Sequence, residues 1–93
     1  MSTKEQIQEQ EDVAVLEQET SKHEIVLYND DVNTFDFVID ALIDVCEHTP
    51  IQAEQCTILV HYKGKCAVKT GDVEELKQRC EQLQSLGLSA VIE

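Results

Sequence analysis

The chain has 93 residues, which is enough for one domain with a modest core. Its formal net charge of -12 disfavours nucleic acid and anionic lipid as partners, because their phosphate groups would be repelled. Hydrophobic residues make up 42% of the sequence and aromatic residues only 4%, so aliphatic side chains must fill most of the core. A basic protein, or a positively charged group on one, suits this surface better.

The sequence has four cysteines at wide spacings, none of them in a C-x-x-C pair: Cys46, Cys56, Cys66 and Cys80. We expect small buried core residues with reduced thiols. The spacing leaves open a zinc site completed by His48 or His61. The polar N-terminus does not resemble a signal peptide, and no apolar run reaches the roughly 18 residues of a membrane helix. We therefore expect a cytoplasmic protein.

The start of the chain is rich in Glu and Gln, with only scattered apolar residues. Such a segment cannot bury enough surface to offset the entropy of ordering, so residues 1–22 are predicted to be a flexible acidic tail. The folded domain is predicted over residues 23–93. It begins with a β-prone run at residues 23–28, which the turn-forming Asn29-Asp30-Asp31 ends.

A helix is predicted next, because apolar residues recur at three- and four-residue spacing from Phe35 to Val45. Asn33 is its expected N-cap, and residues 48–49 end it. Thr49 and Pro50 then have the pattern of an N-cap followed by a first helical residue. This second helix runs to about residue 61 or 62, and it gathers several residues on one side: Ile51, Gln55, Ile58 and Leu59. The two helices suggest an αα-hairpin.

A short strand is predicted at residues 65–69, followed by a third helix that Thr70 or Asp72 would cap. The apolar stripe of this helix is Val73, Leu76, Cys80 and Leu83. Gly87 ends the following turn, and residues 88–92 form the last strand. The order β-α-α-β-α-β predicts an α+β fold in which helices cover one face of a small sheet.

Neither a Gly-rich phosphate loop nor a local catalytic dyad is found, so we expect neither an enzyme nor a cofactor. The adjacent carboxylates and amide of Asn29, Asp30 and Asp31 can surround a cation such as an α-amino group. The same tripeptide is also typical of a solvated turn with an Asx cap. His61 lies in an apolar stretch, where it is either a half-buried structural residue or an acceptor for an ammonium group.

Three stretches together resemble the ClpS family of adaptors. Residues 27–31 and 36–39 are similar to the family's NDD turn leading into an FVI-containing helix. Residues 60–65 are similar to its VH-x-x-G stretch, and residues 70–77 to its T-x-E-V-A-E-x-K stretch. The stretches occur in the family's order, and the resemblance covers residues 23–93.

The resemblance implies a compact domain with a three-stranded antiparallel sheet packed against three helices. It implies an adaptor that binds N-degron substrates, proteins whose first residue is Leu, Phe, Tyr or Trp, through that residue and its free α-amino group. The adaptor would act as a monomer and deliver these substrates to a Clp AAA+ unfoldase, ClpA or a relative, which is coupled to the ClpP peptidase.

The resemblance also assigns roles to residues of this chain. Those implied around the α-amino group are Asn29, Asp30, Asp31 and His61. Those implied in the side-chain pocket are Asn33, Phe35, Val38, Thr57, Val60 and Leu88. Those implied at the contact with the unfoldase are Asp72, Glu75 and Lys77.

The sequence departs from the family pattern inside the pocket. Asn33-Thr34-Phe35 stands where Thr-Pro-Met is usual, and Thr57 replaces a common methionine. The resemblance therefore implies amine capture more directly than a ranking of first residues. The alternative is a non-adaptor interaction domain on a similar scaffold, such as the C-terminal domain of the acidic ribosomal stalk protein. The Asn29-Asp30-Asp31 turn and the His61 stretch favour the adaptor.

Overall fold

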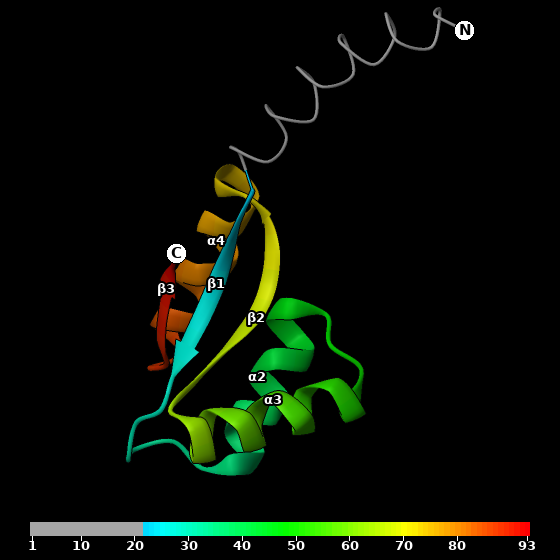
Figure 1. Cartoon of the computed structure of the whole chain (residues 1–93), viewed down its shortest axis with the longest axis vertical. Helices are drawn as coiled ribbons and strands as arrows, with labels where there is room; N and C mark the ends of the chain where they lie inside the picture. Colours follow the sequence, from blue (N-terminus) through cyan, green and yellow to red (C-terminus); the bar gives the residue numbers. More distant parts are fainter. Residues whose placement is uncertain (1–21) are drawn as a thin grey trace, which may run out of the picture.

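The computed structural model describes residues 22–93 (Figure 1). The elements, in chain order, are β1 (Lys22–Tyr28), α2 (Phe35–Cys46), α3 (Pro50–Lys63), β2 (Lys65–Asp72), α4 (Val73–Ser85) and β3 (Ser89–Ile92). The predicted order β-α-α-β-α-β is confirmed. The tail predicted for residues 1–22 lies outside the described residues except for Lys22, which is the first residue of β1.

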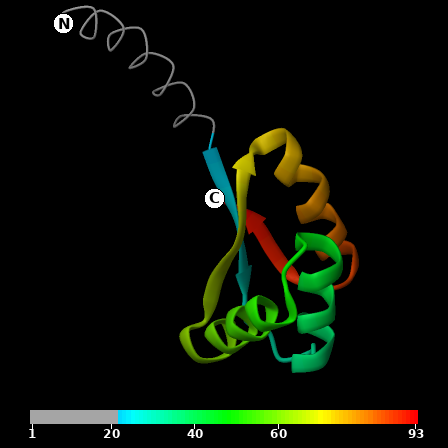
Figure 2. The same ribbon diagram turned by 90° about the vertical axis from the view of Figure 1, so that its right-hand side faces the viewer.

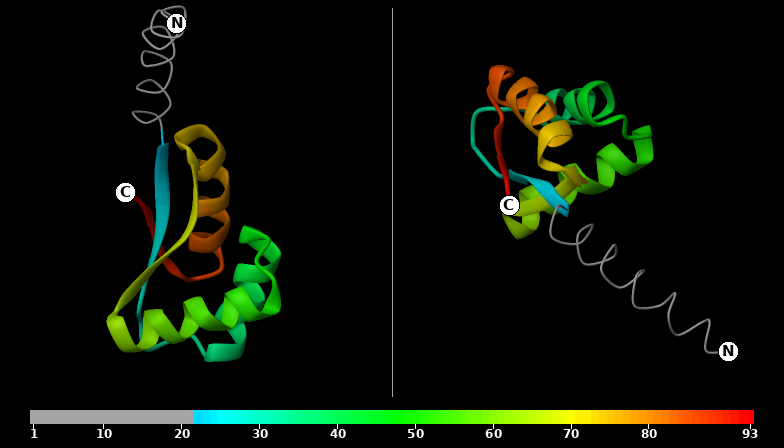
Figure 3. Two further views of the ribbon diagram at one scale, coloured as in Figure 1. Left: turned by 45° about the vertical axis from the view of Figure 1, so that its right-hand side comes forward. Right: turned by 90° about the horizontal axis from the view of Figure 1, so that it is seen from above.

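The sheet is antiparallel throughout, with β1 in the centre and the strand order β2-β1-β3. Tyr28 pairs with Lys65 of β2 and with Ser89 of β3, so all three strands meet at one end of the sheet. Helices α4 and α2 lie on one side of the sheet, and α3 crosses the end at which β1 finishes (Figures 2 and 3). The connections β1–α2, α3–β2 and α4–β3 lie at this end, whereas β2 continues into α4 at the other end.

The core lies between the sheet and the helices. Its largest fully buried side chains come from β1, α2 and α4: Ile25, Leu27, Leu42, Cys46, Leu76 and Leu83. Arg79 of α4 donates a hydrogen bond to the Val45 carbonyl near the end of α2, which joins these two helices. The predicted fold class, α+β with a three-stranded antiparallel sheet and three helices, is confirmed.

The two outer strands each have a backbone carbonyl that accepts a side-chain hydrogen bond. His48 Nε2 lies 2.7 Å from the Val68 carbonyl oxygen of β2, and Gln84 Nε2 lies 2.7 Å from the Ala90 carbonyl oxygen of β3. Val68 lies where the register between β1 and β2 shifts, so it has no partner residue in β1. A β-bulge of this kind interrupts the ladder of an edge strand.

One predicted helix start and one predicted strand end need correction. Asn33 is not the N-cap of α2, because its amide is bonded elsewhere; the N-cap is Thr34, whose Oγ1 accepts a hydrogen bond from the Phe37 N–H at 3.1 Å. Strand β2 continues to Asp72 instead of ending at residue 69, because it pairs with β1 as far as Lys22. Asp72 is the N-cap of α4, but its side chain makes no capping hydrogen bond.

Helix α3 begins as predicted, with Thr49 as the N-cap and Pro50 as the first helical residue, and Thr49 and Gln52 form a reciprocal capping box. Its buried side, however, is formed by small or branched residues: Ala53, Thr57 and Val60. The side with the larger aliphatic residues faces solvent, and Ile51 is 70% exposed. The close approach of α3 to α2 and β2 explains this choice, because the small Ala53 is completely buried there.

Candidate binding site for a chain terminus

The turn after β1 is organised around the carboxylate of Asp30. Its Oδ1 accepts the backbone N–H groups of Val32 at 2.9 Å and Asn33 at 3.0 Å. The Asn33 amide nitrogen adds contacts of 3.2 Å and 3.1 Å to the two carboxylate oxygens. Desolvation acts to raise the pKa of Asp30, but these hydrogen bonds outweigh it and hold that pKa below its ordinary value. The carboxylate therefore stays charged.

Asn33 joins this turn to a distant part of the chain. Its amide nitrogen also donates to the Gly87 carbonyl at 3.0 Å. Gly87 has φ 92, a conformation that favours glycine, and it directly precedes Leu88. The same amide thus fixes the turn after β1 against the segment that leads into β3.

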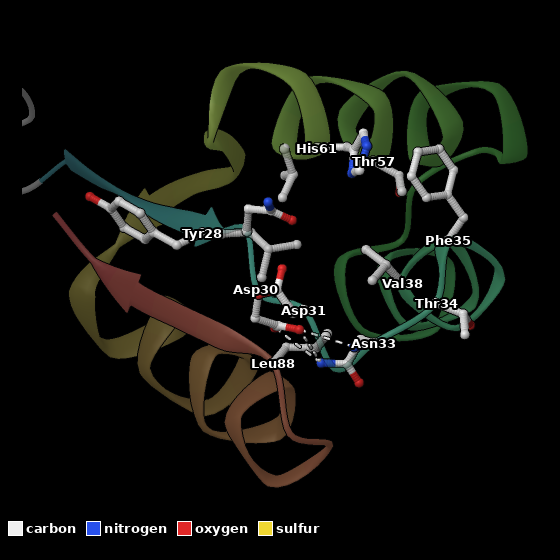
Figure 4. A pocket seen from close by; sticks show the side chains of 13 residues that line it. Tyr28, Asp30, Asp31, Asn33, Thr34, Phe35, Val38, Thr57, His61 and Leu88 are labelled. Atoms are coloured by element: carbon white, nitrogen blue, oxygen red, sulfur yellow. Dashed lines mark hydrogen bonds between the residues drawn. The ribbon is translucent and has the colours of Figure 1, made fainter.

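A cavity of about 310 Å³ opens beside the turn (Figure 4). All ten residues that the resemblance assigned to amine binding and to the side-chain pocket line it: Asn29, Asp30, Asp31, Asn33, Phe35, Val38, Thr57, Val60, His61 and Leu88. They come from the turn, from α2 and α3, and from the residue before β3. One cavity therefore brings together residues from four parts of the chain.

Three further lining residues were not predicted: Leu27, Tyr28 and Thr34. Leu27 and Tyr28 are the last two residues of β1, directly before the turn, and Thr34 directly precedes Phe35. Adjacency to the predicted residues was the signal that could have found them. Tyr28 also donates its hydroxyl to Glu93, and this hydrogen bond is the main cause of the raised pKa of Tyr28.

The inner wall of the cavity is apolar. Val38, Val60 and Leu88 are at most 8% exposed, although they line the cavity. Thr57 is 3% exposed, and its hydroxyl donates to the Ala53 carbonyl at 2.7 Å within α3. With its hydrogen used inside the helix, the Thr57 hydroxyl adds little polarity to the wall. The cavity can therefore receive an apolar side chain.

Phe35 and His61 stand on the two helices that border the mouth. Their ring centroids are 5.3 Å apart in an edge-to-face contact, with an interplanar angle of 73° (Figure 4). Phe35 is 40% exposed and stands at the border of the cavity. Together the two rings narrow the opening between α2 and α3.

The opposite border of the mouth is acidic and polar. Asn29 and Asp31 are exposed there beside the Asp30 carboxylate. The Asn29 backbone N–H donates to the Gly64 carbonyl at 3.0 Å, which holds the turn against the end of α3. Oxygen acceptors beside an apolar cavity suit a ligand that carries a cation next to an apolar side chain.

The three residues predicted to contact the unfoldase lie away from this cavity. Asp72, Glu75 and Lys77 are all exposed. Asp72 pairs with Lys22 at the start of β1, whereas the cavity lies where β1 finishes. Glu75 is 4.0 Å from Arg79, and Lys77 borders a small groove between α4 and β3. The two predicted contact regions therefore occupy opposite ends of β1.

The cysteines are all free, and Cys46 and Cys80 are buried as predicted, while Cys56 and Cys66 are half-buried. Between residues 22 and 93, no three His, Cys, Asp or Glu side chains gather as metal ligands would, so the zinc alternative has no ligand set there. None of the helices in that range has the length and apolar character that a membrane crossing requires.

Comparison with known proteins places the chain among adaptors of a protease. Residues 18–90 match the family described as ATP-dependent Clp protease adaptor protein ClpS. The chain belongs to the ClpS family. This finding confirms the resemblance drawn from the three motifs. The members of the family are named as adaptors, not as enzymes.

Several curated relatives carry the name ATP-dependent Clp protease adapter protein ClpS. That of Synechococcus elongatus is 37% identical over 73 residues, which cover 77% of this chain and 77% of the relative. That of Nitratidesulfovibrio vulgaris is 42% identical over 55 residues, or 57% of this chain. That of Escherichia coli is 39% identical over 59 residues, or 61% of this chain. The matched region spans only 55% and 56% of the length of the last two relatives.

A solved structure shares the fold. It is ClpS2 of Agrobacterium tumefaciens bound to L-phenylalaninamide, and it aligns with a TM-score of 0.75 over 78% of this chain and 95% of that protein. Sequence identity is 19%, so this likeness supports the fold alone.

Proposed function

We propose that this protein captures N-degron substrates in the cavity between β1, α2 and α3 and delivers them to a Clp AAA+ unfoldase coupled to ClpP. The observation that carries the proposal is the pairing of an acidic turn with an apolar cavity at one opening. An N-terminal residue presents the complementary pair, an ammonium group beside a side chain. An internal residue has no such ammonium group.

The acidic turn supports capture of the α-amino group. The carboxylates of Asp30 and Asp31 and the side-chain oxygen of Asn29 offer acceptors, and a neutral His61 ring offers another across the mouth. Asp30 is already committed to Val32 and Asn33, so its role is both to shape the turn and to supply negative charge. Asp31 is the more accessible of the two carboxylates.

The apolar wall supports a preference for large first residues that are not branched at Cβ. A Leu, Phe, Tyr or Trp side chain would displace water from the surfaces of Val38, Val60 and Leu88. The Phe35 and His61 rings narrow the entrance, and a side chain branched at Cβ places its bulk at that neck. Ile and Val should therefore bind more weakly than Leu. The L-phenylalaninamide bound to ClpS2 of Agrobacterium tumefaciens carries an aromatic side chain beside a free amine, which is consistent with this proposal.

Delivery would use a second surface of the protein. We propose that Asp72, Glu75 and Lys77 contact the unfoldase, because they are exposed at the end of β1 opposite the cavity. A substrate held in the cavity would then leave this surface free. Residues 1–21 would be needed for delivery of the substrate and not for its capture. The cytoplasmic location of the protein stays a prediction.

The decisive measurement is calorimetric titration with a Leu-initiated decapeptide, free and N-acetylated. Acetylation removes the charge and two of the three amine donors. At about 1.5–3 kcal/mol for each charge-assisted hydrogen bond, the loss approaches ~4 kcal/mol, or roughly a thousandfold in affinity. Equal affinity for the two peptides would show that Asp30 only stabilises the turn and that the turn does not bind the amine, and the proposal would fail.

Matched variants locate the amine site. Asp31→Asn should weaken binding of the free peptide, whereas Asp44→Asn, which removes the same charge from an exposed position on α2 outside the cavity, should leave it unchanged. His61→Ala should weaken binding, with Gln55→Ala as its control, because Gln55 is an exposed residue of the same helix and does not line the cavity. Equal effects within either pair would contradict the assignment.

Delivery is tested separately with a Clp protease and a fluorescent substrate that begins with Leu. Deleting residues 1–21 should abolish accelerated degradation while peptide affinity stays within a few-fold. The deletion stops before Lys22 because that residue belongs to β1. Undiminished delivery by the shortened protein would contradict the role assigned to the tail.

A further inference from the structure

Two aromatic rings contact the imidazole ring of His61 at the mouth of the cavity. The ring centroid of Phe35, on α2, lies 5.3 Å from that of His61, with an interplanar angle of 73° (Figure 4). The ring centroid of Tyr62, the next residue of α3, lies 4.8 Å away at 87°. Both contacts have the edge-to-face geometry that aromatic pairs favour. Within residues 22–93 the His61 ring makes no hydrogen bond, so these two contacts are what orients it.

The ring of His48 is held in a different way. Its Nε2 lies 2.7 Å from the Val68 carbonyl oxygen. Because a carbonyl can only accept, this nitrogen carries the hydrogen and cannot accept a hydrogen bond from a ligand. The ring contacts of His61 occupy neither of its nitrogens, and His61 is exposed. Aromatic contacts therefore orient the His61 ring and leave its acceptor nitrogen available.

The orientation of His61 matters because a neutral imidazole accepts a hydrogen bond through one nitrogen only, in the plane of the ring. An exposed histidine that nothing holds exchanges between staggered χ1 rotamers on the picosecond to nanosecond timescale. Rotamers that turn the acceptor nitrogen away from the mouth weaken the apparent affinity in proportion to their population. A ring that is oriented before the ligand arrives avoids this loss.

Tyr62 contributes little to the packing of the domain. Its side chain is 76% exposed, and it neither belongs to the buried core nor lines the cavity. Its hydroxyl makes no hydrogen bond within residues 22–93, which leaves the ring contact with His61 as its interaction there. Phe35 also contacts His61, but it borders the cavity as well. Substitution of Tyr62 therefore isolates the effect of a ring contact on His61.

We propose that Tyr62 is a positioning residue for amine capture, which holds the His61 ring so that its nitrogen faces the α-amino group of the ligand. This inference rests on the proposed function, because it explains how His61 is kept ready for the role assigned to it there. Tyr62 acts through His61 and does not itself contact the ligand.

The size of the effect can be bounded. An edge-to-face aromatic pair is worth about a two- to twelvefold change in an equilibrium constant. Tyr62→Ala should therefore weaken binding of a Leu-initiated peptide by a factor in this range. Because Tyr62 acts through His61, this loss should not exceed the loss that His61→Ala causes. Tyr62→Phe keeps the ring and removes only the hydroxyl, so it should bind the peptide as the wild type does.

A double-mutant cycle between Tyr62 and His61 tests the proposal by calorimetric titration with the Leu-initiated peptide. Tyr62→Ala should weaken binding in the wild-type background and have no effect in the His61→Ala background. Equal losses in both backgrounds would show that Tyr62 contacts the peptide directly and would overturn the inference. Ile51→Ala is the matched control, because Ile51 is a 70% exposed apolar residue of the same helix, and it should change neither affinity nor urea midpoint.

Nuclear magnetic resonance of the free full chain provides a readout that does not use peptide binding. Three-bond couplings of the His61 side chain report its χ1 populations. We expect one dominant rotamer in the wild type and in Tyr62→Phe, and averaged couplings in Tyr62→Ala. Unchanged couplings in Tyr62→Ala would overturn the positioning role alone. Wild-type affinity of the His61→Ala protein would instead overturn the amine-binding role of His61, and the positioning role with it.

Discussion

Replacing Asn33 with Ala should loosen the binding cavity without removing any of the acceptors proposed for the α-amino group. The substitution deletes the side-chain amide that contacts the Asp30 carboxylate and the Gly87 carbonyl. It keeps the backbone N–H of residue 33, which continues to bond Asp30. The turn after β1 then loses its attachment to the segment that carries Leu88.

The magnitude follows from the lost bonds. A hydrogen bond to a charged acceptor contributes about 1.5–3 kcal/mol and a neutral one about 0.5–1.5 kcal/mol. The site is partly exposed, so the low end of both ranges applies and the free energy of unfolding should fall by about 2 kcal/mol. For a domain of this size, that corresponds to a melting temperature lower by roughly 8–16 °C. If the ligand must restore the turn on binding, the same energy weakens its affinity by up to about 30-fold.

Far-UV circular dichroism during urea and thermal unfolding measures the stability, because the chain has no Trp to report by fluorescence. Titration with a Leu-initiated peptide measures the affinity. Val32→Ala is the matched control: its side chain is 85% exposed, so both quantities should stay at the wild-type values. The reasoning is refuted if Asn33→Ala and Val32→Ala unfold at the same urea concentration and bind the peptide equally.

Three other substitutions probe separate features. Phe35→Ala should widen the mouth and raise the affinity for Ile-initiated relative to Leu-initiated peptides several-fold, and an unchanged ratio would contradict the narrowing by Phe35. Asp30→Ala should destabilise the domain above about pH 5. Burial acts to raise the pKa of Asp30 in the folded protein, but hydrogen bonding outweighs burial and lowers that pKa. The difference in urea midpoint between the wild type and Asp30→Ala should therefore shrink as the pH falls from about 5 to about 2. Thr49→Ala removes the N-cap of α3 and should cost about 1 kcal/mol in urea unfolding, with Ser expected to restore most of it.

The order of elements could be predicted because local signals agreed with the fold. Thr49, Pro50 and Gly64 are strong start and stop residues, and the structure uses all three as expected. The solvent-facing position of Ile51 could not be predicted in the same way. Periodicity identifies which residues share a side of a helix, but which side is buried depends on how closely a neighbour approaches, and that is set by tertiary packing.

The binding cavity was accessible to sequence reasoning only in part. The chemistry of Asn29, Asp30 and Asp31 suggested a cation site, but nothing local connected this turn to Thr57 or Leu88. The family resemblance made that connection, and the fold brings the residues to one cavity. The hydrogen bond from Asn33 to Gly87 could not be predicted from the sequence, since it joins residues 54 positions apart and depends on the exact ends of α2 and β3.

The side-chain hydrogen bonds to the outer strands bear on how the edges of the sheet meet other polypeptides. An exposed strand edge offers a row of backbone groups to which any extended chain can add, whatever its sequence. Here His48 occupies the Val68 carbonyl, Gln84 occupies the Ala90 carbonyl, and β3 is only four residues long. An extended segment from the middle of another protein therefore meets interrupted edges on both sides of the sheet. Pairing of another chain with either edge is therefore disfavoured at these two positions.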